Sequence, residues 1–189
     1  MATATFDLSA LTLSDPVVSG KGAKSVPVSY AGRPVVWQPP AQKVLFEPSS
    51  FSGEEVSRVN LVMRASPEVV SELTALDESL LGLVVQHSAQ IFGKPCSLEE
   101  ARSRYVYGLK QSDKGYEPTW KVKINVSGKA PVSVWDADKQ RRDLPKCWAG
   151  AQVVPKVTLK SLWIMGKQFG PLFEASDLLL EEAVQTCPF

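Results

Sequence analysis

The sequence contains few of the residues on which most catalytic and metal-binding sites depend. Of its 189 residues, three are cysteine and one is histidine. The odd number of cysteines and the lack of a CxxC spacing indicate reduced thiols instead of a disulfide framework. A single histidine, His87, excludes a His-rich metal site and most Ser/His or Cys/His nucleophiles. His87 itself lies in a helical pattern. Because GxxxxGK[ST], GxGxxG and HExxH motifs are also missing, we expect no enzyme, no metal and no cofactor.

Long apolar runs, internal repeats and a large net charge are missing as well. No stretch approaches the 18 or so uncharged apolar residues of a membrane span, and no period suggests a solenoid. A composition that is 44% hydrophobic with a net charge of +1 excludes general disorder. The first ten residues lack the basic and apolar regions of a signal peptide. We therefore expect a soluble, intracellular, non-secreted protein with no membrane role.

The small net charge hides an uneven distribution. Residues 101–167 carry fourteen Lys and Arg against five Asp and Glu, whereas the segments on both sides are acidic. Such a basic concentration attracts polyanions. The alternative, which the charge count leaves open, is a solvated face whose lysines only keep the protein soluble.

The basic segment also collects aromatic residues, including four of the five tryptophans. The aromatic residues in it are Tyr105, Tyr107, Tyr116, Trp120, Trp135, Trp148 and Trp163. A groove for single-stranded nucleic acid needs cations that follow the phosphates and flat rings that stack on unpaired bases, at about 1–3 kcal/mol per base. The interleaving of the two residue types favours such a groove over a site for duplex DNA.

Hydrophobic periodicity predicts a mainly β protein with helices in one block. Strands are expected at 26–30, 34–37, 43–46, 58–64, 105–110, 119–126, 132–135, 152–165 and 174–180. Ser66 as N-cap, Pro67 at the first helical position and Gly93 as stop predict one long helix, with Glu68, Glu72, Asp77 and Glu78 facing outward. Ser97 and Glu100 form a capping box that opens a second, short helix. This α+β pattern is typical of a small barrel or sandwich with an α insertion.

Alternation within the strands sorts the candidate binding residues. In 120–126 the even-numbered residues are apolar, so Lys121 and Lys123 share an exposed face, while Trp120 falls on the core face unless it lies at the strand end. In 132–135 the same rule places Trp135 outside, next to a basic run, which makes it the best stacking candidate. In 152–165 Lys156 and Lys160 share one face and Trp163 lies on the other, core face.

Three segments together resemble a known family. They are Tyr30-Ala31-Gly32-Arg33-Pro34 leading to Gln38-Pro39-Pro40, then residues 115–123, and then 157–164 followed by Gly166-Lys167-Gln168-Phe169-Gly170. Their order and spacing are similar to those of the single-stranded DNA-binding proteins of nucleocytoplasmic large DNA viruses, which are related to the phage T7 type. The resemblance covers about residues 30–180.

The resemblance implies an OB-fold, a partly open five-stranded β-barrel carrying a long and a short helix. It implies an N-terminal arm at 1–25, one domain at 26–180 with a helical insertion at 66–104, and a C-terminal tail at 181–189. It also implies a homodimer that coats single-stranded DNA in replication, recombination or repair, in the nucleus or at a cytoplasmic viral replication site. The residues themselves do not decide between DNA and RNA.

The predicted interface combines the cations and rings of the basic segment. The predicted nucleic-acid-binding residues are Tyr105, Tyr107, Lys110, Trp120, Lys121, Lys123, Trp135, Arg141, Arg142, Lys146, Trp148, Lys156, Lys160 and Lys167. Members of the T7 type also have an acidic, partner-binding tail that ends in an aromatic residue and contacts replication proteins. Here Phe189 matches that end, whereas Glu181 and Glu182 are far fewer acids than such a tail has.

Two other functions are compatible with parts of the sequence. The apolar run at 178–180, the acidic helix and Phe189 would also suit a protein-interaction or virion-structural module without nucleic acid. A nuclease would need clustered carboxylates, and Asp136 and Asp138 are the close acidic pair of the basic segment. A pair two residues apart in a loop is more typical of a turn.

Overall fold

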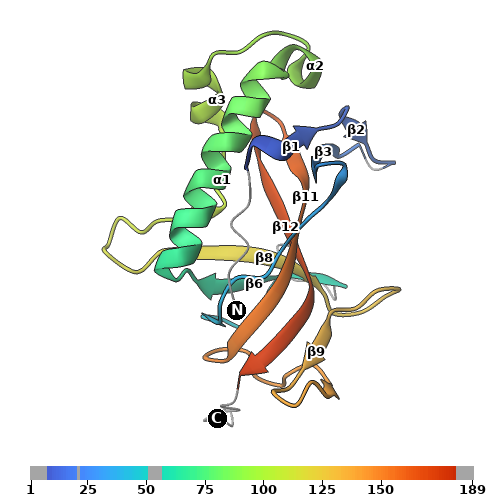
Figure 1. The fold of residues 1–189 in the computed structure, drawn as a ribbon, viewed down its shortest axis with the longest axis vertical. Coiled ribbons are helices and arrows are strands. Elements are labelled where there is room, and N and C mark those ends of the chain that lie inside the picture. The colour runs from blue at the N-terminus through green and yellow to red at the C-terminus, as the bar shows by residue number, and fades with distance from the viewer. Residues whose placement is uncertain (1–7, 21, 51–56, 182–189) are drawn as a thin grey trace. The chain divides into compact units, whose positions relative to one another are not determined.

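The computed structural model describes residues 8–20, 22–50 and 57–181 of the chain (Figure 1). The chain divides into two compact units, each assembled from three separate stretches of sequence. Unit 1 comprises Met1–Val35, Ser71–Gly108 and Leu159–Leu172, and unit 2 comprises Val36–Val70, Leu109–Thr158 and Phe173–Phe189, each in its described part.

Unit 1 contains an antiparallel sheet around one central strand. The strand β3 (Lys24–Tyr30) pairs with β1 (Leu11–Leu13), β2 (Val17–Val18), β4 (Arg33–Trp37) and β11 (Gln152–Met165). A two-residue turn joins β11 to β12 (Gln168–Glu181), and Gly166 adopts the positive φ of +59° that such hairpin turns require at their first position. β1 and β2 fall in the segment 1–25 that the sequence predicts as an arm, so the described part of that segment contributes strands to a sheet.

The helices follow the predicted start signals. α1 (Pro67–Gln86) begins at Pro67, and the Ser66 hydroxyl accepts the Val69 N–H at 3.4 Å. The helical path breaks at His87 and resumes as α2 (Ser88–Phe92), which ends at Gly93 in the left-handed conformation. α3 (Leu98–Arg104) is capped by Ser97, whose hydroxyl accepts the Glu100 N–H at 3.1 Å. Among the described helices, none has the length and apolarity that crossing a bilayer requires.

Asp77 is buried in unit 1, although the sequence predicts it on the outward face of the helix. It is 2% exposed, and its carboxylate accepts the Tyr105 hydroxyl at 2.6 Å and the Gly108 N–H at 3.2 Å. Burial raises the pKa of Asp77 to about 6, against the lowering effect of these two hydrogen bonds. The strand expected at 105–110 is reduced to an isolated bridge between Tyr105 and Phe169 and to β7 (Leu109–Lys110).

Unit 2 is organised by a long antiparallel pair. β6 (Arg58–Arg64) and β8 (Thr119–Asn125) pair along all seven residues. β12 pairs in parallel with β8 and with β9 (Ser133–Trp135). The antiparallel pairings join β7 to β8, β10 (Arg141–Arg142) to β9, and β5 (Gln42–Lys43) to β11. The strand expected at 43–46 is shifted and shortened to β5, and the strand expected at 174–180 is extended to β12. The sequence does not predict β10.

Aromatic packing forms the centre of unit 2. The ring of Trp120 lies 5.2 Å from that of Trp37 and 6.1 Å from that of Phe173, measured between centroids. Every second residue of β8, Trp120, Val122 and Ile124, is buried, as the alternation predicts. This packing fixes which face of β8 remains available to a ligand.

The architecture is mainly β with few helices, which is consistent with an OB-like fold. The described residues contain twelve strands, so the barrel of five strands is not reproduced in its simple form. Several of the added strands are only two or three residues long.

We expect the buried Asp77 to make stability depend on pH. A carboxyl whose pKa is raised from 3.8 to about 6 by folding favours the fold when protonated, so this contribution is complete below about pH 4 and is lost as the pH rises through about 6. The two-unit difference corresponds to about 3 kcal/mol. Thermal unfolding of Asp77→Asn should therefore lack the fall in Tm, roughly 5–10 °C, that the parent chain shows between about pH 4 and 7.

The exposed Asp138 provides the matched control for this experiment. Asp138→Asn should keep the pH profile of the parent chain. Parallel profiles for the parent chain and Asp77→Asn would contradict the assignment of the titrating group.

Candidate nucleic-acid interface

A hollow in unit 2 brings a tryptophan together with two lysines. Its volume is about 320 Å³. It is lined by Gln38, Trp135, Lys139, Val154, Lys156, Asp177 and Leu179. We call it the Trp135 hollow; its lining residues come from β9, β11, β12 and the neighbouring loops.

Hydrogen bonding fixes the Trp135 ring. The half-buried side chain donates its Nε1–H to the Asp177 carboxylate at 3.1 Å. Asp177 in turn lies 3.9 Å from the Lys156 ammonium. The parallel pairing of β9 with β12 sets Trp135 opposite Leu179, so the backbone holds the same arrangement. The indole is therefore held in one orientation before any ligand arrives.

The loop that joins β9 to β10 positions Lys139. The Lys139 N–H donates to the Asp136 carbonyl at 2.9 Å, and the Asp136 N–H donates to the Gln140 carbonyl at 3.0 Å. This is a type I turn followed by a left-handed residue, a position where glycine is preferred. Lys139 occupies it with φ of +59°, at a cost of about 1–2 kcal/mol for a residue with a Cβ.

Asp136 organises this loop as a hydrogen-bond acceptor. Its carboxylate accepts the Gln140 N–H at 2.8 Å and the Arg142 guanidinium at 2.6 Å. The Gln140 N–H, together with Arg142, holds the pKa of Asp136 below its usual value. The carboxylate pair 136/138 thus has the structural role in a turn that the sequence pattern favours.

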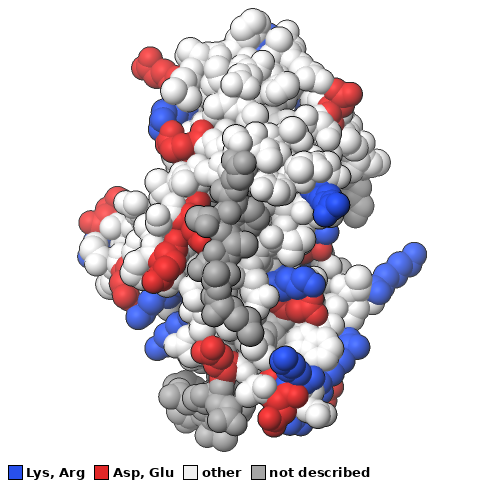
Figure 2. Space-filling model, viewed as in Figure 1, with Lys and Arg blue, Asp and Glu red and all other residues white. Residues whose placement is uncertain are grey.

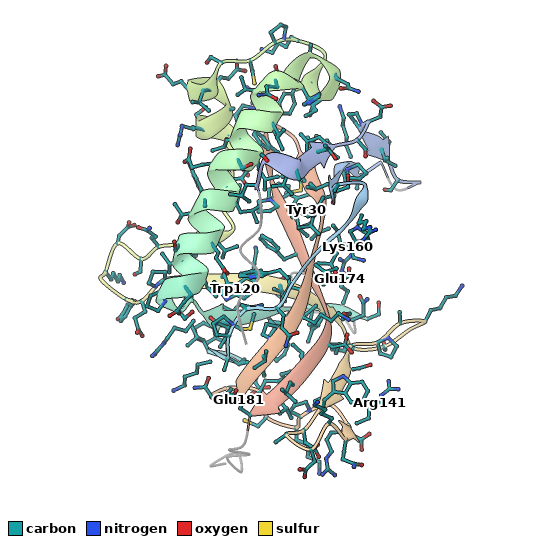
Figure 3. The ribbon with its side chains drawn as sticks, viewed as in Figure 1. Tyr30, Trp120, Arg141, Lys160, Glu174 and Glu181 are labelled. Atoms are coloured by element: carbon teal, nitrogen blue, oxygen red, sulfur yellow. The ribbon has the colours of Figure 1, made fainter. Side chains whose placement is uncertain are left out.

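The β10 arginines lie next to the stacking candidate. Arg141, labelled in Figure 3, is opposite Trp135 in the register of the antiparallel β9–β10 pair, and Arg142 is opposite Val134. Both are exposed, but Arg142 is held by Asp136. The two residues form a short strand that the strands expected from the sequence do not include.

A second group of cations lies on the outward face of the β6–β8 pair. Lys121 and Lys123 alternate with the buried residues of β8, and the register places Lys123 next to the β6 residues near Arg58. Partial burial, followed by repulsion from Arg58 and Lys121, lowers the pKa of Lys123. Glu174 lies opposite Lys123 and neutralises Arg58 through an ion pair at 2.5 Å, so the positive potential of this face comes from Lys121 and Lys123.

Three of the predicted stacking rings are buried, which corrects those predictions. Trp120 is 1% exposed in the core of unit 2, and Tyr105 and Trp148 are each 6% exposed. The Trp148 backbone is fixed because its N–H and that of Ala149 donate to the Glu47 carboxylate at 2.8 and 2.9 Å. In these positions the faces of the three rings are covered by protein and cannot stack on bases.

The other predicted residues are divided between the two units. Tyr107, Lys160 and Lys167 are exposed in unit 1, whereas Lys110 and Lys146 are exposed in unit 2 outside the Trp135 hollow. In the predicted tail, Glu181 is the last residue of β12, and Glu182 and Phe189 lie outside the described residues. The structure thus gathers Trp135, Lys156 and Arg141 in one unit and leaves part of the predicted set elsewhere.

Acidic partners reduce the basic excess of residues 101–167 locally. Ion pairs join Arg102 to Glu78 and Arg104 to Glu100, in addition to the two pairs described above. On the face drawn in Figure 2, Lys and Arg are interspersed with Asp and Glu. Within the described ranges, no group of three or more His, Cys, Asp or Glu side chains could hold a metal ion.

A second hollow of unit 2 was missed by the sequence analysis. It contains the exposed rings of Phe46 and Tyr116 together with Lys110 and Lys114. Phe46 lies outside the basic segment, and its exposure follows from the fold and not from a local pattern. The one local signal for this hollow is Tyr116, an aromatic residue that follows Lys114 and the Gly115 turn.

Comparisons with known proteins identify the fold. No family model matches the chain, and no curated protein matches it by sequence. Among solved structures, gp2.5, the single-stranded DNA-binding protein of bacteriophage T7, is 13% identical and aligns over 80% of this chain and 93% of its own, with a TM-score of 0.51. The single-stranded DNA-binding protein of bacteriophage Enc34 is 10% identical over 94% of this chain and 96% of its own, also with a TM-score of 0.51. The chain therefore has the fold of the phage-type single-stranded DNA-binding proteins.

Proposed function

We propose that the protein binds single-stranded DNA with little sequence preference, through the Trp135 hollow and the outward face of β8. The observation that carries the proposal is a tryptophan held by Asp177 in a hollow that also contains Lys139 and Lys156. A flat ring can stack on any unpaired base, and cations beside it can contact the flanking phosphates. The likeness in fold to phage proteins with this activity supports the proposal.

Lys121, Lys123 and Arg141 extend the proposed phosphate path within unit 2. Lys121 and Arg141 are exposed, and Lys123 is half-buried next to the ion pair of Arg58 with Glu174. Lys110, Lys146, Lys160, Lys167 and Tyr107 stay predictions as further contacts. Trp120, Tyr105 and Trp148 are no longer included, because they are buried.

The biological role follows as part of the same proposal. A protein of this kind would coat and protect unpaired strands in DNA replication, recombination or repair without itself catalysing a reaction. A homodimer, contacts with replication proteins, an intracellular viral setting and kinship to large DNA viruses stay predictions from the sequence resemblance. The alternative is a protein-interaction or virion-structural module, which would not be retained on single-stranded DNA cellulose at low salt.

The first test compares nucleic-acid forms and salt concentrations. Fluorescence anisotropy should show tighter binding to a single-stranded oligonucleotide, longer than the roughly 4–16 nucleotides that one OB-fold covers, than to its duplex. If about four or five phosphates are contacted, log affinity should fall with log salt at a slope of about −3. An RNA oligonucleotide of the same sequence measures the preference for DNA. Equal binding of duplex and single strand, or a flat salt response, would contradict the proposed mode.

The second test addresses Trp135. A bound strand should quench tryptophan emission, and Trp135→Ala should reduce this quench and weaken binding by roughly tenfold, because one stacked base is lost. Trp135→Phe keeps a ring but loses the hydrogen bond to Asp177, and it should bind with intermediate affinity. An unchanged quench and affinity in Trp135→Ala would exclude this ring from the interface.

The third test uses the backbone conformation of Lys139. Lys139→Gly relieves the left-handed strain, so its Tm should be equal to or higher than that of the parent chain, while its affinity for single-stranded DNA should fall a few-fold through the loss of about one phosphate contact. Lys129→Gly removes an exposed loop lysine outside the hollow and should affect affinity less. If the two variants bind alike, the position of Lys139 carries no functional meaning.

A further inference from the structure

The second hollow of unit 2 has the composition of a nucleotide site. Its volume is about 600 Å³, and its walls include the rings of Phe46 and Tyr116 and the cations of Lys110, Lys114 and Arg64. Glu117 and Asp113 are also part of it. We call it the Tyr116 hollow. Neither the predicted site residues nor the Trp135 hollow includes its two rings.

The exposure of these rings is large for aromatic side chains. Phe46 is 62% exposed and Tyr116 is 72% exposed. Burying an aromatic ring stabilises a fold by about 1.5–3 kcal/mol, so two uncovered rings in one hollow forgo a sizeable contribution. Exposed apolar groups gathered in one place mark binding sites more often than isolated ones do.

Backbone hydrogen bonds fix the chain beside both rings. Next to Phe46, the Leu45 N–H donates to the Val62 carbonyl of β6 at 3.0 Å. Tyr116 follows a turn in which the Gly115 N–H donates to the Ser112 carbonyl at 3.3 Å, with Gly115 at φ of +74°. The loop that carries Tyr116 is closed at its base, where Lys110 pairs with Thr119.

The charges around the rings favour an anionic ligand. Arg64 is paired with Glu117 at 2.8 Å, which neutralises both. Within the described part of the chain, no salt bridge engages Lys110 or Lys114, and both are exposed. The hollow therefore presents two aromatic faces beside two available ammonium groups, opposed by the single carboxylate of Asp113.

Strand geometry connects this hollow with the Trp135 hollow inside unit 2. β8 begins at Thr119, which lines the Tyr116 hollow, and continues through Lys121 to Lys123. Lys123 is the partner of Glu174 on β12, which runs parallel to β8 and reaches Asp177 and Leu179 of the Trp135 hollow. At about 3.3 Å per residue this path is about 30 Å long. Its length suits several nucleotides and exceeds what one can cover.

We infer that the Tyr116 hollow is a second base-binding subsite, in which an unpaired base stacks on Tyr116 and Phe46 and its flanking phosphate contacts Lys110 and Lys114. The inference rests on the proposed function and extends its site. The occupant is a single-stranded nucleic acid and not an apolar peptide, because ammonium groups stand beside the rings and the path from β8 leads to the Trp135 hollow.

The test measures the affinity of the full chain for a fluorescein-labelled oligo(dT) strand. Tyr116→Ala and Phe46→Ala should each weaken binding by about five- to a hundredfold, which is the range for loss of one stacked base. Tyr116→Phe should bind like the parent chain, since stacking needs the ring and not the hydroxyl. Their Tm values should stay unchanged, because the Tyr116 ring is largely exposed. Leu98→Ala, an exposed apolar residue of α3, is the matched control and should not alter affinity.

A second measurement locates the contact directly. Ultraviolet cross-linking of oligo(dT) followed by mass spectrometry should give an adduct on Tyr116 or Phe46. If the parent chain does not bind oligo(dT), both the proposed function and this subsite are refuted. If it binds and both alanine variants bind equally tightly, only the subsite is refuted. A shift from dimer to monomer in Tyr116→Ala, with affinity unchanged, would show instead that the hollow contacts a second copy of the chain.

Discussion

The register between β6 and β8 is the constraint on which the proposed interface depends. Because Trp120, Val122 and Ile124 fill the core of unit 2, the residues between them must face outward, and two of these are lysines. A shift by one residue would exchange the two sets and bury the charges. The packing of Trp120 against Trp37 and Phe173 therefore determines the position of the cations as well as the stability of the sheet. Partial burial of Lys123, with repulsion from Arg58 and Lys121, lowers the pKa of that ammonium group.

Two aspartates prepare the Trp135 hollow. Asp177 holds the indole through Nε1, and Asp136 holds the turn that carries Lys139 and binds Arg142. Each acid reduces the local positive charge, so the interface is less basic than the composition of residues 101–167 indicates. The acids weaken the Coulombic attraction for a phosphate, but they also lower the entropic cost of binding, because side chains that are already fixed lose less entropy when a ligand binds. The left-handed backbone of Lys139 belongs to the same turn, and strained conformations of this kind cluster at ligand-binding sites.

Sequence reasoning succeeded where a pattern is local. The start of α1 at Pro67 and the bounds of β6 and β11 follow from capping and alternation alone. It failed where a distant partner decides. Asp77 looked like a surface acid until Tyr105 and Gly108 were brought to it, and Trp148 looked like a surface ring until Glu47 fixed its backbone. Phe46 enters the proposed subsite through tertiary structure alone, so no local pattern could have identified it.

The mixture of rings and acids would also account for the proposed preference for single strands. A uniformly positive surface would bind the dense phosphates of duplex DNA at least as well. Around Trp135 the carboxylate of Asp177 repels a phosphate, whereas the ring attracts an exposed base, which a duplex keeps inside its stack. Lys139 in the hollow, with Lys121 and Arg141 elsewhere in unit 2, then places positive charge where the sugar–phosphate chain would pass on either side of a stacked base. Selectivity in the proposed interface thus depends on the carboxylate that lowers the positive charge beside the ring as much as on the cations around it.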